Sequence, residues 1–293
     1  TLFDTRHEQA ALFMAEAWGR MTRKPGIAMV TAGPGFTNAL SGVANARLAN
    51  SPLVLIAGCI GLESREKLDL QDMSQLPVIS PMVKKAFACY NPERIPEFID
   101  LAYRTAISGR PGPVYLELPV DILNAAVNEE KIKRIHTDVD SRPVDPDKAK
   151  KIIEMIQEVR SPIVIAGSGA WYSDASSELC QFIENTGIPA FTSSLGRGTI
   201  SDTDPLCFES SLAIRPGAAL AANMTADLII FLGARMGLFY IFGDIFSKDA
   251  TIIQVDIEQE EIGRNRSVDL AVMSDIKPLL KEGNALYFSH GFS

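Results

Sequence analysis

Several features that would assign this 293-residue sequence to a familiar class are missing from it. No uninterrupted apolar run reaches the ~18 residues that a membrane-spanning helix needs, and no signal-peptide pattern is seen, so no membrane partner is expected. The longest basic stretch is only Lys131-Ile132-Lys133-Arg134, and the net charge of -8 argues against a nucleic-acid partner. No Gly-x-Gly-x-x-Gly sequence follows an apolar strand, which disfavours a Rossmann-type dehydrogenase.

Cysteine is scarce, and the four cysteines show no Cys-x-x-Cys spacing. None of the three histidines, His7, His136 and His290, stands at ligand spacing from a cysteine, so a zinc site is not expected. Scattered cysteines in or beside apolar segments are typical of reduced, partly buried thiols. A cytoplasmic location is therefore expected.

The sequence has the composition of a globular protein, with 46% hydrophobic and 22% charged residues, and its length suits two domains. Short apolar runs that predict buried strands occur at 27–31, 53–58, 114–118, 161–166, 189–192, 228–232 and 251–256. Between them, spacing and capping predict helices at 8–22, 38–49, 93–107, 146–159, 174–186 and 218–224, and a helix start near Glu258. Apolar strands that alternate with helices predict an α/β fold of two doubly wound, Rossmann-like parallel sheets.

A change in composition separates the two predicted domains. Residues 128–147 are densely charged and include two prolines, which is typical of a linker. The predicted domains are therefore 1–127 and 148–282, with a tail at 283–293. The sequence opens on Thr1-Leu2-Phe3-Asp4, which enters at once what resembles an interior strand end, so the first domain is expected to be incomplete.

Two short stretches in the first domain are candidates for chemistry. Glu8 stands where an extended segment turns into a helix, and Gly33-Pro34-Gly35 breaks the chain after the next strand. Each has an ordinary structural explanation by itself, because helix dipoles favour an acid in the first turn and turns use glycine routinely.

Taken together, these stretches resemble a known family. Arg6–Arg20 (RHEQAALFMAEAWGR), Val30–Asn38 (VTAGPGFTN) and Ser108–Ile122 (SGRPGPVYLELPVDI) match, in order and spacing, the thiamine diphosphate-dependent enzymes of the acetolactate synthase and benzaldehyde lyase superfamily. Residues 1–127 resemble that family's pyrimidine-binding domain. Residues 148–282 resemble its central domain, through the turn at Gly233 and the run from Ile253 to Gly263.

The resemblance gives Glu8 a catalytic role. In this family a carboxylate bonded to N1′ of the aminopyrimidine favours the imino tautomer, whose nitrogen then takes the thiazolium C2 proton. Glu8 matches that carboxylate, and such a role implies a raised pKa in an apolar pocket. The turn Gly33-Pro34-Gly35, called the elbow from here on, would lie beside the cofactor's pyrimidine, with Phe36 and Asn38 at its rim. The implied cofactor-binding residues are Glu8, Gly33, Pro34, Gly35, Phe36 and Asn38.

A predicted exposed loop, residues 62–73, supplies a second implied catalytic residue. Gln71, in Leu68-Asp69-Leu70-Gln71-Asp72, matches a family glutamine that reaches the substrate side of the cofactor in the partner subunit's site, although a loop glutamine in solvent is the alternative. Leu70 stands where acetolactate synthases usually have phenylalanine, which departs from the pattern of that branch. Lys84 matches a family lysine, although a solvated lysine explains it equally well.

The central domain of the family offers a nucleotide crevice whose occupant differs between branches: FAD in the synthases, ADP in acyl-CoA lyases and decarboxylases, and nothing in aldehyde lyases. In this sequence the matching positions are Arg110, Gly167, Gly169, Ser194, Gly233, Ala234, Arg235 and Asp256. The run from Leu232 to Leu238 is most similar to the lyase branches, so an empty crevice stays open as an alternative.

The family also has a third domain, which binds the diphosphate through Mg²⁺ with a Gly-Asp-Gly motif and a later Asn-Asn pair. Neither is present here, since Gly243-Asp244 is followed by Ile245. The resemblance therefore implies that the Mg²⁺ ligands lie outside these residues, and that residues 1–293 alone bind the cofactor poorly and are inactive. It also implies a homodimer or a dimer of dimers.

The implied activity is that of an acetolactate synthase-like carboligase or lyase, which acts on 2-oxo acids or 2-hydroxy ketones through an acyl carbanion. An aldehyde lyase or 2-hydroxyacyl-CoA lyase is the alternative within the superfamily. A non-catalytic nucleotide-binding or assembly subunit with this fold is the alternative of another class.

Overall fold

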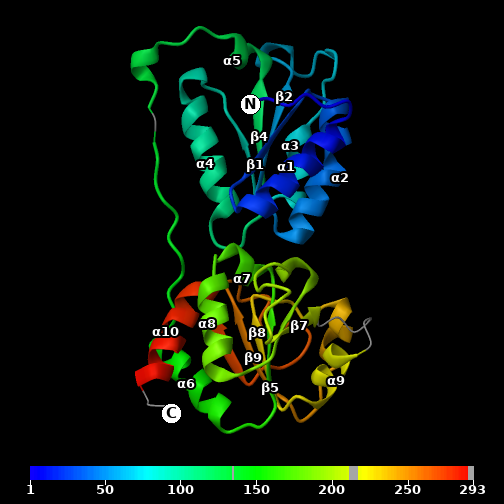
Figure 1. Ribbon diagram of the computed structural model, residues 1–293. Helices are drawn as coiled ribbons and strands as arrows, with labels where there is room; N and C mark the ends of the chain where they lie inside the picture. Colours follow the sequence, from blue (N-terminus) through cyan, green and yellow to red (C-terminus); the bar gives the residue numbers. More distant parts are fainter. Residues whose placement is uncertain (134, 211–216, 290–293) are drawn as a thin grey trace. The chain divides into compact units, whose positions relative to one another are not determined.

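The computed structural model describes residues 1–133, 135–210 and 217–289, and it divides into two compact units (Figure 1). The N-terminal unit is Thr1–Asp140 and the C-terminal unit is Ser141–Ser293. The boundary lies within the predicted linker, where 132–133 and 135–145 form no helix or strand. Arg134 and residues 290–293, which belong to the predicted linker and tail, lie outside the described residues.

The N-terminal unit is built on a parallel sheet with the strand order β1-β2-β4-β3. Its strands are β1 (Gly26–Val30), β2 (Leu53–Cys59), β3 (Lys85–Ala88) and β4 (Pro113–Pro119). Alternate residues of β2 and β4 pack on opposite faces, as the two-residue period of a strand requires. Leu55 and Tyr115 lie on the face covered by α1 and α2, whereas Ile56 and Leu116 lie on the face covered by α4 (Figure 1).

The helices of this unit are α1 (Glu8–Thr22), α2 (Pro34–Ala49), α3 (Gln75–Ile79), α4 (Ile95–Ile107) and α5 (Val120–Asn124). The predicted start of α2 at Asn38 is wrong by four residues, because the elbow is itself the first turn of the helix. Gly33 is the N-cap and Pro34 occupies the first helical position, where its missing N–H costs nothing.

The C-terminal unit has a second parallel sheet, with the strand order β10-β9-β8-β5-β6-β7. Its strands are β5 (Pro162–Ala166), β6 (Ala190–Thr192), β7 (Cys207–Ser210), β8 (Leu228–Leu232), β9 (Thr251–Asp256) and β10 (Leu270–Met273). Its helices are α6 (Pro146–Gln157), α7 (Ser168–Tyr172), α8 (Ser176–Thr186), α9 (Ala218–Thr225) and α10 (Ile276–Ser289). Both sheets of the described chain contain only parallel pairs, which confirms the predicted fold class.

One prediction for the C-terminal unit is wrong. No helix begins near Glu258, because residues 257–266 form turns held by the buried Gln254, whose amide donates to Glu261 O at 3.1 Å and accepts from Gly263 N at 2.9 Å. Residue 283, where the predicted tail starts, lies inside α10, which continues to Ser289.

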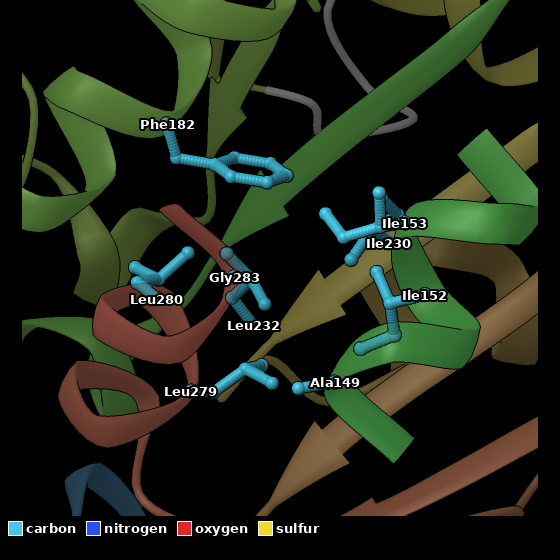
Figure 2. A pocket seen from close by; sticks show the side chains of 9 residues that line it. All are labelled: Ala149, Ile152, Ile153, Phe182, Ile230, Leu232, Leu279, Leu280 and Gly283. Carbon is cyan, nitrogen blue, oxygen red and sulfur yellow. The ribbon is translucent and has the colours of Figure 1, made fainter. Parts of the chain in front are cut away.

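A small apolar cavity of about 20 Å³ lies between α6, α8, α10 and the second sheet (Figure 2). It is lined by Ala149, Ile152, Ile153, Phe182, Ile230, Leu232, Leu279, Leu280 and Gly283. Its lining offers no polar partner that would hold a water molecule, so it is a packing defect. Gly283 lies in the interior of α10, and a Cβ built on it meets no atom within 4 Å.

We therefore expect Gly283→Ala to stabilise the C-terminal unit. In a helix interior alanine is more favourable than glycine by about 0.8–1.0 kcal/mol. The added methyl group also enters open apolar space. Urea unfolding should show the higher midpoint. Gly187→Ala is the matched control: its Cβ also meets nothing, but Gly187 ends α8 at φ +68°, so the same change should destabilise the unit.

Candidate active site

Glu8 is the first residue of α1, as the sequence predicts. The helix start is fixed by His7, whose Nδ1 accepts a hydrogen bond from Gln9 N at 3.1 Å. His7 itself has extended backbone, so the chain turns into the helix at this point. The position of Glu8 at the start of α1 directs its partly exposed carboxylate toward the elbow, which forms the first turn of α2.

The glycines of the elbow are required by what lies against them. Gly33 has φ +59°, and a Cβ on it would lie 2.9 Å from the Cβ of Gln71. A Cβ on Gly35 would lie 2.6 Å from Cγ2 of Thr31 and 3.6 Å from Oε1 of Glu8. The structure thus brings Glu8, the elbow and Gln71 together, although Glu8 and Gln71 are 63 positions apart in sequence.

Asn38 joins α2 to the candidate carboxylate. Its Nδ2 donates to Oε2 of Glu8 at 3.0 Å. This bond, and a larger contribution from the backbone N–H of Glu8, hold the pKa of the carboxyl below its usual value, because both stabilise the charged form. The raised pKa that the family role implies is therefore wrong for this chain, since no apolar pocket covers Glu8 within the described N-terminal unit.

We expect Asn38→Ala to raise the pKa of Glu8 toward the ordinary value of 4.5, because one of the donors that favour the carboxylate is lost. In the unchanged chain the lowered pKa contributes stability above pH 4.5 that is lost as the pH falls through the folded pKa, and the variant should lose less on acidification. A ¹³C NMR titration of the Glu8 carboxyl measures the shift. Thr37→Ala is the control, because the Thr37 hydroxyl donates only to Pro34 O.

Phe36 does not lie at the rim of the elbow, where the resemblance places it. Its side chain is 0% exposed and makes an edge-to-face contact with Tyr115, with ring centroids 5.6 Å apart. As the third helical residue of α2 it points into the core, whereas Pro34 and Asn38 stay exposed. Phe36 therefore anchors the elbow from the inside, and its ring is not available to a ligand.

The loop that carries Gln71 is exposed, as predicted, and has an unusual backbone. Glu66, Leu68 and Gln71 all have positive φ, at 63°, 59° and 66°. Non-glycine residues rarely adopt this conformation, which is characteristic of strained segments at functional sites. Leu68 is 95% exposed, while Gln71 turns back and lies against Gly33. Lys84, the other matched residue, caps α4: its Nζ donates to Thr105 O and Ser108 O, both at 2.6 Å.

Sequence reasoning missed a buried polar network directly behind the elbow. Glu117 is only 3% exposed, in the central strand β4. Its carboxylate accepts from Gln75 Nε2 and Tyr115 OH, both at 3.2 Å, and from Arg65 Nη2 at 3.4 Å. A single acid inside the apolar run 113–119 was the available indication, because charged residues are rarely buried without partners.

The same network excludes Cys59 as a nucleophile. Burial, together with the nearby charge of Glu117, raises the pKa of the Cys59 thiol to about 12. At neutral pH the thiol is therefore protonated and unreactive.

In the C-terminal unit, the loops at the carboxyl ends of the strands meet through glycine. A Cβ on Gly167 would lie 2.1 Å from Gly233 O, and one on Gly169 would lie 2.6 Å from Gly233 Cα. Gly169 N also donates to Gly233 O at 3.0 Å. The structure thus brings Gly167, Gly169, Gly233 and Ala234 together, and backbone packing explains why glycine is needed.

The remaining predicted crevice residues are placed less directly. Ser194 begins the short turn η5 (Ser194–Gly196), whose Gly196 packs against Gly167, and Asp256 ends β9, where its Oδ1 accepts from Glu258 N at 2.9 Å. Arg235 follows Ala234 and is half-buried. Arg110 belongs to the N-terminal unit, where its Nε donates to Asn50 Oδ1 at 2.8 Å.

Comparison with known protein families shows which family this chain belongs to. Residues 1–78 match the family described as "Thiamine pyrophosphate enzyme, N-terminal TPP binding domain", and residues 149–282 match "Thiamine pyrophosphate enzyme, central domain". The chain belongs to the thiamine pyrophosphate enzyme family. Glu8, the elbow and Gln71 therefore lie in the TPP-binding domain, and the glycine-rich loops of the second sheet lie in the central domain.

Individual relatives of this thiamine pyrophosphate enzyme chain carry several activities in their names. It is 33% identical to a "Probable acetolactate synthase large subunit" of Methanococcus aeolicus, over 95% of this chain and 47% of that protein. It is 33% identical to an "Oxalyl-CoA decarboxylase" of Escherichia coli, over 92% and 48%, and 30% identical to a "2-hydroxyacyl-CoA lyase 1" of Dictyostelium discoideum, over 97% and 50%. The chain thus spans about half the length of these relatives.

A solved structure gives the same relationship. Benzoylformate decarboxylase from Polynucleobacter necessarius matches with a TM-score of 0.82 and 26% identity, over 96% of this chain and 53% of that one. In the described ranges, no helix has both the length and the apolar character needed to cross a membrane. Among the same residues, no three His, Cys, Asp or Glu side chains are grouped in a way that could hold a metal ion.

Proposed function

We propose that the protein is a thiamine diphosphate-dependent carboligase or lyase, similar to acetolactate synthase, that acts on 2-oxo acids or 2-hydroxy ketones. The observation that carries the proposal is the placement of Glu8: its carboxylate faces a Gly-Pro-Gly elbow and is held there by Asn38, within a domain of the thiamine pyrophosphate enzyme family. A helix dipole explains an acid in the first turn, but it does not explain an elbow and an amide placed against that acid.

The residues around Glu8 fit the aminopyrimidine of the cofactor. Gly33 and Gly35 let the elbow pack tightly against Gln71 and Thr31, which sets the elbow next to the Glu8 carboxylate. Oε2 of Glu8 accepts a hydrogen bond from Asn38. Oε1 lies on the Gly35 side, where it can accept a hydrogen bond from a ring nitrogen of the cofactor. Bound thiamine diphosphate supplies a thiazolium carbon that becomes nucleophilic when its proton is removed.

The chain's own residues would then act as follows. Glu8 would share a proton with a ring nitrogen of the cofactor, and the loss of water from its carboxylate on binding would raise its pKa, which is lowered in this chain. Gln71, which lies against Gly33, offers its amide to a polar group of the substrate. Asn38 fixes the orientation of Glu8 and is not consumed.

A lyase of the same superfamily is the second candidate. Leu70 occupies the position where acetolactate synthases usually have phenylalanine, and the Dictyostelium relative named as a 2-hydroxyacyl-CoA lyase is 30% identical. The experiment compares products from pyruvate, benzoin and a 2-hydroxyacyl-CoA, with and without thiamine diphosphate and Mg²⁺, in the protein expressed from its natural gene. Turnover that does not depend on the cofactor would refute both candidates, whereas no turnover of any of the three substrates would favour a non-catalytic subunit.

We also propose that the diphosphate is held by Mg²⁺ with ligands outside residues 1–293, and that FAD or ADP can occupy the central-domain crevice. The glycine contacts draw the loops around Gly167 and Gly233 together at the carboxyl ends of the strands, which is where open α/β sheets bind their ligands. A 450 nm flavin band from the purified protein would identify FAD, and ADP released on denaturation would identify the alternative. Neither signal would mean an empty crevice.

The outer face of α1 supports a homodimer or a dimer of dimers. Ala10, Phe13, Met14, Ala17, Trp18 and Met21 follow helical spacing and are all exposed, with Trp18 at 60%. An apolar stripe of this kind on a monomer marks an interaction surface. We propose that a second copy covers it in the assembled protein, and sedimentation of Trp18→Glu should show a lower mass than the unchanged protein.

The four free cysteines support a reducing, cytoplasmic setting.

A further inference from the structure

We infer that Gln75 and Glu117 are positioning residues that fix the cofactor-facing elbow from inside the N-terminal unit. The inference rests on the proposed function for its meaning in catalysis, but its geometry is independent of it. Gln75 Oε1 accepts a hydrogen bond from Gly33 N at 2.9 Å, across 42 residues of sequence. This is a direct side-chain bond to the backbone of the glycine whose positive φ shapes the elbow.

The amide of Gln75 can point only one way. Its Nε2 faces three acceptors: Gly58 O at 3.0 Å, Tyr115 OH at 2.9 Å and Glu117 Oε2 at 3.2 Å. A carbonyl and a carboxylate can only accept, so they select the NH₂ group and leave Oε1 on the side of Gly33. A reversed amide would set oxygen against a buried carboxylate and NH₂ against the Gly33 N–H, which would leave both ends unpaired.

Tyr115 strengthens the same polarity. Its hydroxyl donates to Glu117 Oε2 at 3.2 Å, so the oxygen of that hydroxyl is free to accept from Gln75. Burial and the charge of Glu117 raise the pKa of Tyr115, which keeps the phenol protonated and able to donate. A chain of bonds therefore runs from Glu117 through Tyr115 and Gln75 to Gly33.

Glu117 also ties in the loop that carries Gln71. Arg65, six residues before Gln71, donates from Nη2 to Glu117 Oε1 at 3.4 Å, and its guanidinium lies 5.5 Å from the ring centre of Tyr90. One buried carboxylate thus holds both parts of the site, the elbow through Gln75 and the loop through Arg65. A change at Glu117 should therefore be transmitted to Gly33 and to Gln71, neither of which it touches.

The test uses Gln75→Leu, which keeps the volume and removes both ends of the tether. In the 293-residue chain, amide hydrogen exchange at Gly33 should accelerate by about ten-fold or more, because its acceptor is lost. In the protein expressed from its natural gene, kcat should fall on the order of 10²-fold, the effect of a misplacement near 1 Å, while the KM for substrate changes little. Thiamine diphosphate with Mg²⁺ is the probe for cofactor affinity, which should also weaken.

Ser51→Ala is the matched control. Ser51 donates to another buried carboxylate of the same unit, Glu16, at 2.6 Å, and does not contact the elbow. It should lower the stability and leave both Gly33 exchange and kcat unchanged. If Gln75→Leu does not fold, Glu117→Gln replaces it. This variant keeps the size of the side chain and loses the ion pair with Arg65, and we expect the same changes in exchange and kcat with smaller magnitude.

Each outcome decides the inference. Unchanged exchange at Gly33 would overturn the tether, and faster exchange with unchanged kcat and cofactor affinity would overturn the positioning role. An equal loss of kcat in Ser51→Ala would show a general effect of stability instead. A failure of the proposed function is separate, because the unchanged protein would then not bind thiamine diphosphate, and the role in catalysis would fall with it whatever the exchange showed.

Discussion

Replacing Glu8 by glutamine should abolish nearly all thiamine-dependent turnover. Glutamine keeps the shape of the side chain and can still accept from Asn38, so the elbow and α1 should be preserved. It cannot take up or return a proton, and activation of the cofactor should fail altogether. We expect a loss larger than the ~10²–10⁴-fold that an ordinary general acid or base contributes. Steady-state kinetics with saturating thiamine diphosphate and Mg²⁺ measure it.

Glu97→Gln is the control for this variant. Glu97 is also an acid in the first turn of a helix of the N-terminal unit, α4, where it forms an ion pair with Arg94 at 2.7 Å. If Glu8 served only to balance the helix dipole, the two variants should behave alike. Wild-type turnover in Glu8→Gln would refute the proposed function at its root, whereas a loss confined to Glu8→Gln would support it.

Gly167→Ala should be strongly destabilising, although alanine is usually the mildest replacement for glycine. Gly167 has φ -107°, so its backbone conformation suits any residue, and the cost comes from contact alone. The new Cβ would lie 2.1 Å from Gly233 O and 2.6 Å from Ala234 Cα, which are backbone atoms that cannot rotate away. We expect the unfolding free energy of the C-terminal unit to fall by about 3 kcal/mol, the upper range for overpacking.

The fluorescence of Trp171, in α7 directly after Gly167, reports this unfolding when Trp18 is replaced by phenylalanine. Gly237→Ala is the matched control, because Gly237 also has negative φ and its Cβ would meet nothing within 4 Å. It should change the free energy by no more than about 0.5 kcal/mol. A neutral Gly167→Ala would show that the Gly233 loop yields, and the crevice would then be adaptable.

The strands of both sheets could be predicted closely. All seven predicted strands form, each with ends within one residue of the prediction, because buried parallel strands are continuous apolar runs bounded by turn residues. Strands β3, β7 and β10 were missed. Each has only four residues and lies at an edge of its sheet, and a run of this length is too short to show a strand period.

For the site, the motifs indicated which residues belong together but not how they meet. The structure gathers Glu8, Gly33, Gly35, Asn38 and Gln71 at one place. Phe36 was assigned to the rim because it adjoins the elbow, but the helical turn directs it into the core. Gln75 was not singled out, since a lone glutamine beside a loop has no distinctive pattern.

By itself, the sequence determined the two parallel α/β sheets, the turn at Gly33 and the membership of the thiamine pyrophosphate enzyme family, because periodicity, glycine positions and motif spacing are local properties of the chain. The tertiary structure decided the charge state of Glu8, the inward direction of Phe36 and the tether from Glu117 through Gln75 to Gly33. These depend on which groups from distant segments come within hydrogen-bonding distance. That is set by the packing of helices on the sheet and not by any pattern along the chain.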